Sequence, residues 1–356
     1  MSTQNPLPPR SEARRAKSGT GRKRRMKWLL WLLLPLLLIA GAAVWYVGDL
    51  YFTAKDAIRN ISTISTEAEA ASDETVEYRE HPPVSVREMP IALLVMGLDT
   101  RPNIGSLNTD VLMAAALDPE EKRAVVVTIP RDTRIDVEGY RERKANAYYA
   151  NFFTAARKEM DAKEADQKAR NEMKELFGKF FGIPIDYAVK INFQGFSDVV
   201  DALGGIEVYV DQDMKYTDVA GNTYIDLKKG QQTLNGDQAL DFIRYRQSNG
   251  GTRESSDLER NRRQSEVIGA LTDRLLSLGS ITKLDDVIAA VGNNVSIDMP
   301  APEIERMIGV YFGIRRSDIT FIQLQGEWRS PYIHLDEAKL EEAKAALRGI
   351  MAPRLE

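Results

Sequence analysis

The chain has 356 residues, 43% of them hydrophobic and 28% charged, so it can bury a substantial core in one large domain or two smaller ones. It has no cysteine, which excludes disulfides, thiolate nucleophiles and cysteine-based zinc sites, and its two histidines, His81 and His334, lie away from the charged clusters described below. The net charge of −4 combines nine Lys or Arg and one acid in residues 1–27 with an acidic remainder, whereas a nucleic-acid-binding domain concentrates positive charge on its folded part.

The first predicted element is a membrane span. Residues 28–47, "WLLWLLLPLLLIAGAAVWYV", carry no charge, and twenty residues of helix cover the ~30 Å hydrocarbon core. Aromatic side chains lie near both ends of this segment, and five Lys or Arg precede it. We therefore expect a cytoplasmic basic tail (1–27), a signal-anchor helix (28–48) in the cell membrane and an extracytoplasmic body. A cleaved signal peptide is the alternative, since small residues occur at Ala40, Ala42 and Ala43.

Residues 49–88 have the composition of a linker. This segment is polar and acidic, and two prolines close it. A membrane-proximal helix over its first part is an open alternative. From residue 89 to 356 the pattern is that of a globular domain.

Three apolar runs open this domain, and their β-branched content predicts strands over Ile91–Met96, Val111–Leu117 and Ala124–Ile129. A turn signal over Asp118–Lys122 joins the last two runs as an antiparallel hairpin. If Leu117 pairs with Ala124, the register places the residues before the second run opposite the residues after the third run.

That register places Asp110 across from Arg131, with Cα atoms ~4.5–5.5 Å apart. Asp99 follows the first run, and it joins the group if that strand ends at the same edge. Each residue alone also fits an ordinary solvated strand end, but their coincidence favours a site. Asp132 follows Arg131 and could act as a general base or brace the arginine.

The next stretch predicts a helix over Thr154–Gly182 and then a strand, a helix and a strand. Asp211-Gln212-Asp213 follows, and it has the DxD pattern of metal-binding nucleotide-sugar glycosyltransferases. A three-residue pattern is weak, and a solvated loop is the preferred interpretation.

"LNGDQALDFIRYRQ" predicts a short helix capped at Asn235 that enters a brief strand. On such a strand Arg244 and Arg246 project from the same face, which is costly unless an anion lies between them. "SSDLERNRRQ" then begins a helix, with Ser255 or Ser256 as its N-cap.

On that helix Asp257, Arg260 and Gln264 share one face, and Arg262 and Arg263 are interpreted as solvated. The candidate set is thus several arginines with two carboxylates and no histidine. Arginine forks match phosphate oxygens, and Mg²⁺ is commonly held by one or two carboxylates plus substrate phosphates. The pattern favours metal-assisted phosphoryl transfer on a pyrophosphate over acyl transfer.

These motifs resemble the LytR-CpsA-Psr family of cell-envelope proteins over nearly all of residues 90–350. The matching segments, in family order, are "LLVMGLDTR", "NTDVLMAAALDPEEKRAVVVTIPRDT", "INFQGFSDVVDALGGIEV", "LNGDQALDFIRYR" and "DLERNRRQ". The resemblance implies an α/β fold with an α+β tendency, in which helices flank a central mixed β-sheet.

The resemblance also implies a phosphotransferase. Such an enzyme moves a cell-wall glycopolymer (teichoic acid, capsule or similar) from an undecaprenyl-pyrophosphate carrier to a peptidoglycan hydroxyl. Mg²⁺, or Mn²⁺ in its place, would assist. By position, Asp99 and Asp110 would hold the metal, and Arg131, Asp132 and Asp99 would be catalytic. The pyrophosphate site would comprise Arg131, Arg244, Arg246, Arg260, Gln264 and Asp257.

In the family the prenyl tail occupies an apolar cavity, for which the candidates here are Phe152, Phe153, Phe177, Phe181 and Phe193. The chain departs from the family in two places. Asn108-Thr109-Asp110 stands where an Arg often precedes the Ser/Thr-Asp pair, and Lys144-Ala145-Asn146-Ala147 lacks the usual histidine. Both departures leave the choice of polymer and acceptor open.

Two alternatives remain at this point. One is a non-catalytic polyprenyl-pyrophosphate-binding or regulatory envelope protein, and the other is a DxD glycosyltransferase that uses Asp211 and Asp213. The acidic body outside the cytoplasm argues against direct nucleic-acid contact.

Overall fold

A computed structural model describes residues 55–56, 58–63, 86, 88–98, 107–219, 223–277, 294–311 and 313–355, without the side chains of residues 257, 258 and 261. The predicted membrane span, the basic tail and Asp99 lie outside these residues. Within the described part of the chain, no helix combines the length and hydropathy that a membrane crossing requires.

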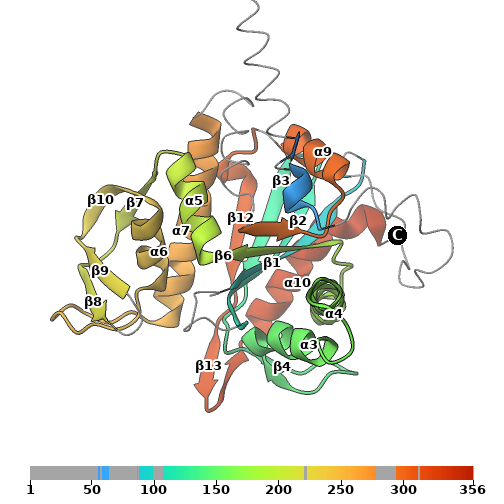
Figure 1. The fold of residues 1–356 in the computed structure, drawn as a ribbon, viewed down its shortest axis with the longest axis horizontal. Helices are drawn as coiled ribbons and strands as arrows, with labels where there is room; N and C mark the ends of the chain where they lie inside the picture. The colour runs from blue at the N-terminus through green and yellow to red at the C-terminus, as the bar shows by residue number, and fades with distance from the viewer. Residues whose placement is uncertain are drawn as a thin grey trace, which may run out of the picture. The chain divides into compact units, whose positions relative to one another are not determined.

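A six-stranded mixed sheet forms the centre of the domain, in the order β11-β6-β1-β2-β3-β12 (Figure 1). Its strands are β1 (Ile91–Leu98), β2 (Thr109–Asp118), β3 (Arg123–Thr128), β6 (Tyr187–Asn192), β11 (Val295–Ile297) and β12 (Ile319–Gln323). The three predicted opening strands are confirmed, as is the predicted hairpin, in which Leu117 pairs with Ala124. The pairings make β1, β3, β6 and β12 parallel to one another, so their carboxyl ends lie at one edge.

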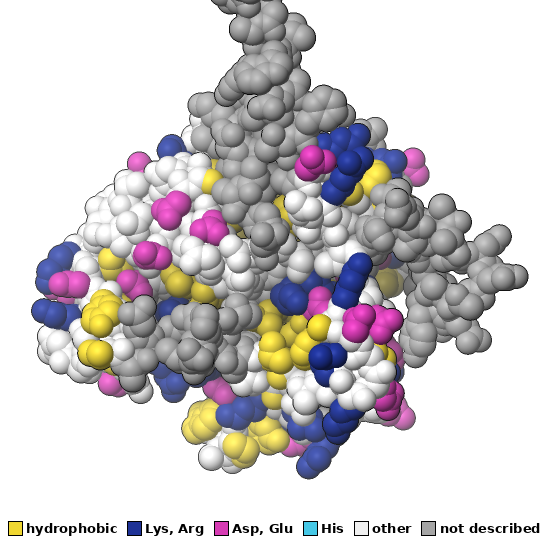
Figure 2. All heavy atoms as spheres, viewed as in Figure 1, with side chains coloured by type: hydrophobic (Ala, Val, Ile, Leu, Met, Phe, Trp, Pro, Cys, Tyr) yellow, Lys and Arg dark blue, Asp and Glu magenta, His cyan; other side chains and the backbone are white. Residues whose placement is uncertain are grey.

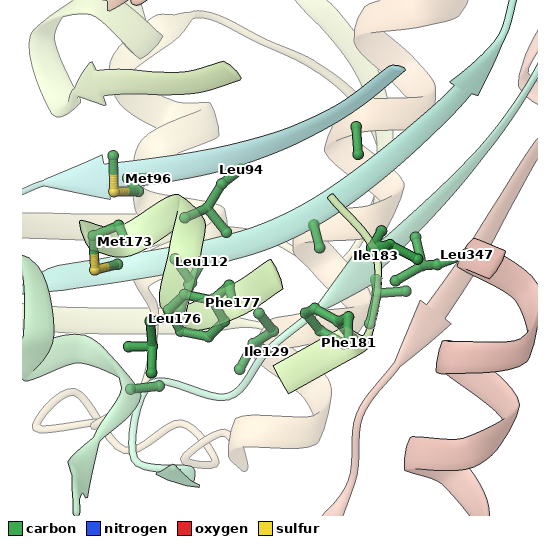
Figure 3. Packing of buried hydrophobic residues seen from close by; sticks show 14 of the residues in the cluster. Leu94, Met96, Leu112, Ile129, Met173, Leu176, Phe177, Phe181, Ile183 and Leu347 are labelled. Carbon is green, nitrogen blue, oxygen red and sulfur yellow. The ribbon is translucent and has the colours of Figure 1, made fainter. Parts of the chain in front are cut away.

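One face of the sheet is covered by helices α3 (Tyr148–Ala156), α4 (Ala162–Phe181) and α10 (Glu337–Met351). Figure 3 shows Leu94 and Leu112 of the sheet beside Phe177 of α4. Alternate strand residues point to this face because side chains alternate along a strand. The single helix predicted over Thr154–Gly182 is wrong: Asp161 accepts hydrogen bonds from the amides of Lys163 and Glu164 and begins α4 anew.

The other face is covered by α7 (Asp257–Ser277) and α9 (Ala301–Tyr311), around a second apolar cluster. Ile58 and Ile61 are buried in this cluster, and Ser62 Oγ donates to the carbonyl oxygen of Met299 at 2.7 Å. Residues that the sequence assigned to the linker therefore pack on the sheet. Together with the covered first face, this gives a helix–sheet–helix arrangement, and the expected α/β fold is confirmed.

A lobe with its own apolar cluster lies beside the sheet, at the left of Figure 1. It contains α5 (Phe193–Ala202), α6 (Gly236–Arg244), β7 (Ile206–Val210), β8 (Met214–Asp218), β9 (Thr223–Leu227) and β10 (Gly230–Leu234), packed against α7. Two short strand pairs lie outside the sheet and the lobe: β4 (Arg134–Ile135) pairs with β5 (Arg143–Lys144), and β13 (Gly326–Arg329) pairs with β14 (Tyr332–Leu335).

Candidate active site

The charged residues at the end of the β2–β3 hairpin are in direct contact. The last ladder bond runs from the Ile129 amide to the Leu112 carbonyl at 2.9 Å, and Pro130, which has no N–H, follows it. Beyond that point, Arg131 Nη1 lies 3.1 Å from Asp110 Oδ1. The contact that the hairpin register predicts is therefore confirmed.

A cavity of about 180 Å³ opens beside this pair, at the edge where the carboxyl ends of β1, β3, β6 and β12 meet. Ligands of open α/β sheets commonly bind outside the carboxyl ends of the strands. The cavity is lined by Asp110, Val111, Arg131, Phe193, Ile243, Arg244, Arg246, Arg260 and Gln264. The cavity thus brings together the four predicted arginines, the predicted glutamine and one predicted carboxylate. They come from β2, the loop after β3, the lobe and α7.

The arginines of α6 reach the cavity in a way that differs from the prediction. The strand predicted around Arg244 and Arg246 is wrong, because α6 continues to Arg244 and Tyr245 begins a coil. The predicted N-cap is confirmed: Asn235 accepts from the Gln238 amide at 2.9 Å, and Gln238 accepts from the Asn235 amide at 3.1 Å. A helix end followed by coil places both arginines at the cavity, as a strand would also have done.

Phe193, the first residue of α5, positions Arg244. The guanidinium carbon of Arg244 lies 4.7 Å from the centre of the Phe193 ring, a cation–π distance. Asn192 fixes the start of α5, since its side chain accepts from the Gly195 amide at 2.7 Å. Phe193 lines the cavity together with Asp110 and the four arginines, and we call this cavity the anion cavity. Two of the other phenylalanines expected around a prenyl tail, Phe177 and Phe181, are fully buried in the filled core.

Arg260 and Gln264 come from α7 and are 9% and 6% exposed. They lie one turn apart, so they share a face of the helix. Of the two predicted N-caps, Ser255 and Ser256, the structure selects Ser256: its Oγ accepts from the Glu259 amide at 3.2 Å, and Glu259 accepts from its amide at 2.8 Å. The side chain of Asp257 lies outside the described part of the chain.

Asp132 does not line the cavity but contacts two cations beside it. Its Oδ1 lies 2.8 Å from Lys144 Nζ, and its Oδ2 lies 3.5 Å from Arg131 Nε. Lys144 was not among the candidate residues. Lys144 lies on β5, where it pairs with Arg134 of β4. Two-residue strands leave no periodic signal in the sequence, so only the structure reveals this contact.

Asp241 titrates unusually within α6. Burial raises its pKa to about 7, although the positive charge of Arg244 acts to lower it and the nearby Asp237 raises it further. This carboxyl lies one turn before Arg244, so its charge state changes the field at one end of the cavity.

Arg262 and Arg263 both bind Asp211. The sequence interpretation of both as solvated is wrong for Arg263, which is buried. Arg263 is fully buried and holds Asp211 with two contacts, Nε to Oδ1 at 2.8 Å and Nη2 to Oδ2 at 3.0 Å. Arg262 adds a contact to Asp211 Oδ2 at 2.9 Å. Asp213 accepts from the Lys229 amide at 2.8 Å. Both DxD carboxylates thus have partners within the protein, and Asp211 is held by a buried arginine, which argues against a nucleotide-sugar metal site there.

Comparison with known proteins shows the family of this chain. Residues 58–349 match the LytR_cpsA_psr family. The chain is 29% identical over 276 residues to the polyisoprenyl-teichoic acid–peptidoglycan teichoic acid transferase TagV of Bacillus subtilis strain 168; this match covers 74% of the chain and 66% of that protein. It is 30% identical over 272 residues to the transferase TagT of the same strain, covering 72% of the chain and 76% of TagT.

The fold is shared as well. The crystal structure of B. subtilis TagV superposes with a TM-score of 0.59 at 28% identity, over 74% of this chain and 98% of that one.

Proposed function

The chain belongs to the LytR-CpsA-Psr family, and from this premise we propose that it transfers a cell-wall glycopolymer from a polyprenyl-pyrophosphate carrier to a hydroxyl group of peptidoglycan. The observation that carries the proposal is the cavity in which four arginines, Gln264 and Asp110 meet. The names of the TagV and TagT relatives support the same reaction class. The carrier is undecaprenyl pyrophosphate in this proposal, and the polymer is a teichoic acid, a capsule or a similar chain.

The arginines bind the pyrophosphate. Guanidinium groups present paired N–H donors that match phosphate oxygens. Four of them around a cavity of about 180 Å³ repel one another, and a pyrophosphate relieves that repulsion. Gln264 lines the cavity and would donate to the pyrophosphate, and Asp257, which precedes Arg260 by three residues, would orient that arginine.

The residues at the rim fit a divalent cation on the pyrophosphate. Asp110 Oδ1 accepts from Arg131, while Oδ2 accepts no hydrogen bond from the described residues. Mg²⁺ in enzymes of phosphoryl transfer commonly takes one or two carboxylates and completes its shell with phosphate oxygens and water. Asp110, with Asp99 immediately after β1, would hold Mg²⁺ or Mn²⁺. When bound, the cation neutralises charge that develops on the phosphate oxygens.

The transfer breaks one bond and forms one. The acceptor hydroxyl oxygen attacks the phosphorus that carries the sugar, and the bond from that phosphorus to the bridging oxygen of the pyrophosphate breaks. Polyprenyl phosphate leaves with the electron pair, and Arg131 stabilises its charge. The hydroxyl proton passes to Asp132 Oδ2, whose contact with Arg131 is long at 3.5 Å, while Lys144 fixes Oδ1 at 2.8 Å.

The proposal also places the enzyme at the outer face of the cell membrane. Residues 28–47 would form the single span, the basic tail would stay in the cytoplasm, and the folded domain would face the peptidoglycan. Lipid carrier and acceptor are then both within reach of the domain.

Arg131→Ala tests the function. We expect transfer to fall by roughly a thousandfold or more, because charge stabilisation of this kind supplies that much in phosphoryl transfer. Polymer attached to peptidoglycan would be measured with the purified full chain, a lipid-linked donor and Mg²⁺. Arg157→Ala is the matched control, since Arg157 is exposed and bonds the Met160 carbonyl at the end of α3. Undiminished transfer by a folded Arg131→Ala variant contradicts the proposal.

A further inference from the structure

The β13–β14 hairpin is fixed to the loop that carries Arg131. The Ile333 amide donates to the Asp132 carbonyl at 2.8 Å, and Thr133 forms a bridge with Ile333. At the base of the hairpin, the Asp336 amide donates to the Gln325 carbonyl at 2.8 Å. The hairpin therefore holds its side chains at a set position relative to the anion cavity.

Trp328 is opposite Ile333 in this hairpin, and the two residues share one face of it. Ile333 is buried, whereas Trp328 is 55% exposed. Lys144 Nζ lies 5.4 Å from the centre of the Trp328 ring. Figure 2 shows hydrophobic side chains next to Lys or Arg side chains around this hairpin, at the bottom of the view.

A chain of contacts connects this tryptophan to the cavity. Lys144, which lies over the ring, also holds Asp132 Oδ1 at 2.8 Å, and Asp132 in turn contacts Arg131. A single exposed aromatic residue is ordinary on a protein surface. The Trp328 ring differs from such a residue, because the hairpin fixes its position and Lys144 contacts both the ring and the proposed general base.

We propose that Trp328 and Lys144 form the acceptor subsite, in which a sugar ring of the peptidoglycan strand stacks on Trp328 and presents its hydroxyl to Asp132. This inference rests on the proposed function and adds the surface that binds its second substrate. Binding sites combine aromatic walls with a few placed polar groups, and a pyranose ring offers an apolar face with hydroxyls at its rim. Lys144 donates to those hydroxyls beside the ring.

The charges around Trp328 favour a glycan over a polyanion. Lys144 is paired with Asp132, and Arg329 is paired with Glu327 at 2.6 Å. A surface with its charges paired offers hydrogen bonds and little net field, which suits a strand of sugars. The four arginines of the anion cavity, with one carboxylate among them, suit the pyrophosphate of the donor instead.

The opposite face of the hairpin lines a separate groove. Glu327 and Arg329 alternate with Trp328 along β13 and therefore point to the other face. With His334 and Phe180 they line a groove of about 950 Å³. Because Trp328 does not line this groove, the groove is not part of the acceptor subsite.

Acceptor kinetics test the subsite. Trp328→Ala should raise the KM for soluble, uncrosslinked peptidoglycan strands on the order of tenfold, as expected for loss of one aromatic stack. The KM for the lipid-linked donor should stay unchanged, and Trp328→Phe should restore most of the acceptor affinity. Tyr224→Ala is the matched control, because Tyr224 is 59% exposed on β9 in the lobe. An unchanged acceptor KM in Trp328→Ala, or an equal rise in the donor KM, overturns the inference.

A binding measurement separates this inference from the proposed function. The chain has four tryptophans, and the other three lie at positions 28, 31 and 45, so the difference in fluorescence between the full chain and Trp328→Phe reports on Trp328. Addition of the same strands should quench this difference signal. Quenching without any transfer contradicts the enzymatic function but supports glycan binding at the acceptor subsite. Transfer without quenching contradicts the acceptor subsite alone.

Discussion

Charge at the cavity depends on a small number of residues. Asp110 is the one described carboxylate among four lining arginines, and it shares Oδ1 with Arg131. Removal of its charge therefore leaves Arg131 with the longer contact to Asp132 at 3.5 Å and removes the described candidate ligand for a cation. The same residue thus influences anion binding and metal binding in opposite directions.

Asp110→Asn should separate these two effects. We expect the Mg²⁺ concentration for half-maximal transfer to rise by on the order of tenfold, because an amide oxygen binds the cation more weakly than a carboxylate does. EDTA should abolish transfer by the unaltered chain, and added Mg²⁺ should restore it. A Mg²⁺ titration of the variant that coincides with that of the unaltered chain would show that Asp110 is not a metal ligand.

The raised pKa of Asp241 predicts how the free energy of unfolding depends on pH. Its pKa in the fold, about 7, lies above the ordinary value of 3.8, so the folded state binds more protons than the unfolded state between these values. The stability contribution of this group is therefore full below about pH 4 and declines as the pH rises to about 7. Asp241→Asn should remove this decline and be more stable than the unaltered chain at pH 8.

Chemical denaturation at pH 5 and pH 8 measures that difference. Asp226→Asn is the control, because Asp226 is an exposed carboxylate on β9. A stability gain for Asp241→Asn that is equal at both pH values would contradict a raised pKa of Asp241.

At the scale of elements, α7 carries both cavity residues and a structural anchor. Arg260 and Gln264 face the cavity, whereas Arg263 points into the lobe and binds Asp211 after β7. Arg263 Nη1 also donates to Ser255 Oγ at 2.8 Å. This anchor holds the helix in the rotation that presents Arg260 to the cavity.

Arg263→Ala should destabilise the domain by about 3–5 kcal/mol, because it leaves Asp211 without its buried partner. Asp213→Ala should change the free energy of unfolding by less than about 1 kcal/mol, since Asp213 is largely exposed and pairs with the exposed Lys228 at 3.6 Å. The free energy of unfolding in urea measures both. A stable Arg263→Ala variant that loses only metal or nucleotide-sugar binding would revive the DxD interpretation.

The same elements show what the sequence could predict. The turn at Asp118–Lys122 and the alternating apolar residues were sufficient for the hairpin register, and hence for the contact between Asp110 and Arg131. Local pattern could not tell whether Arg244 ends a helix or lies on a strand, because a short amphipathic stretch fits both periods. The buried state of Arg263 depends on Asp211, 52 residues away, and no local pattern records it.

At the scale of the whole domain, the site lies where two packing units meet. The sheet supplies Asp110 and Arg131, and the lobe with α7 supplies the other arginines. The family resemblance anticipated this grouping, whereas the contact between Lys144 and Trp328 requires the docking of a hairpin from the end of the chain. The proposed donor and acceptor surfaces thus come from segments far apart in the sequence, joined through the loop at Arg131 and Asp132.

The most direct test of the central claim follows both products of one reaction. Purified full chain, a polyprenyl-pyrophosphate-linked glycopolymer, peptidoglycan strands and Mg²⁺ would be incubated together, and polyprenyl phosphate and polymer-bearing strands would be quantified. We predict that the two products appear in equal amounts and that the polymer is joined to the strand through a phosphodiester. Tight donor binding without release of polyprenyl phosphate would contradict the claim and identify the protein as a binding protein.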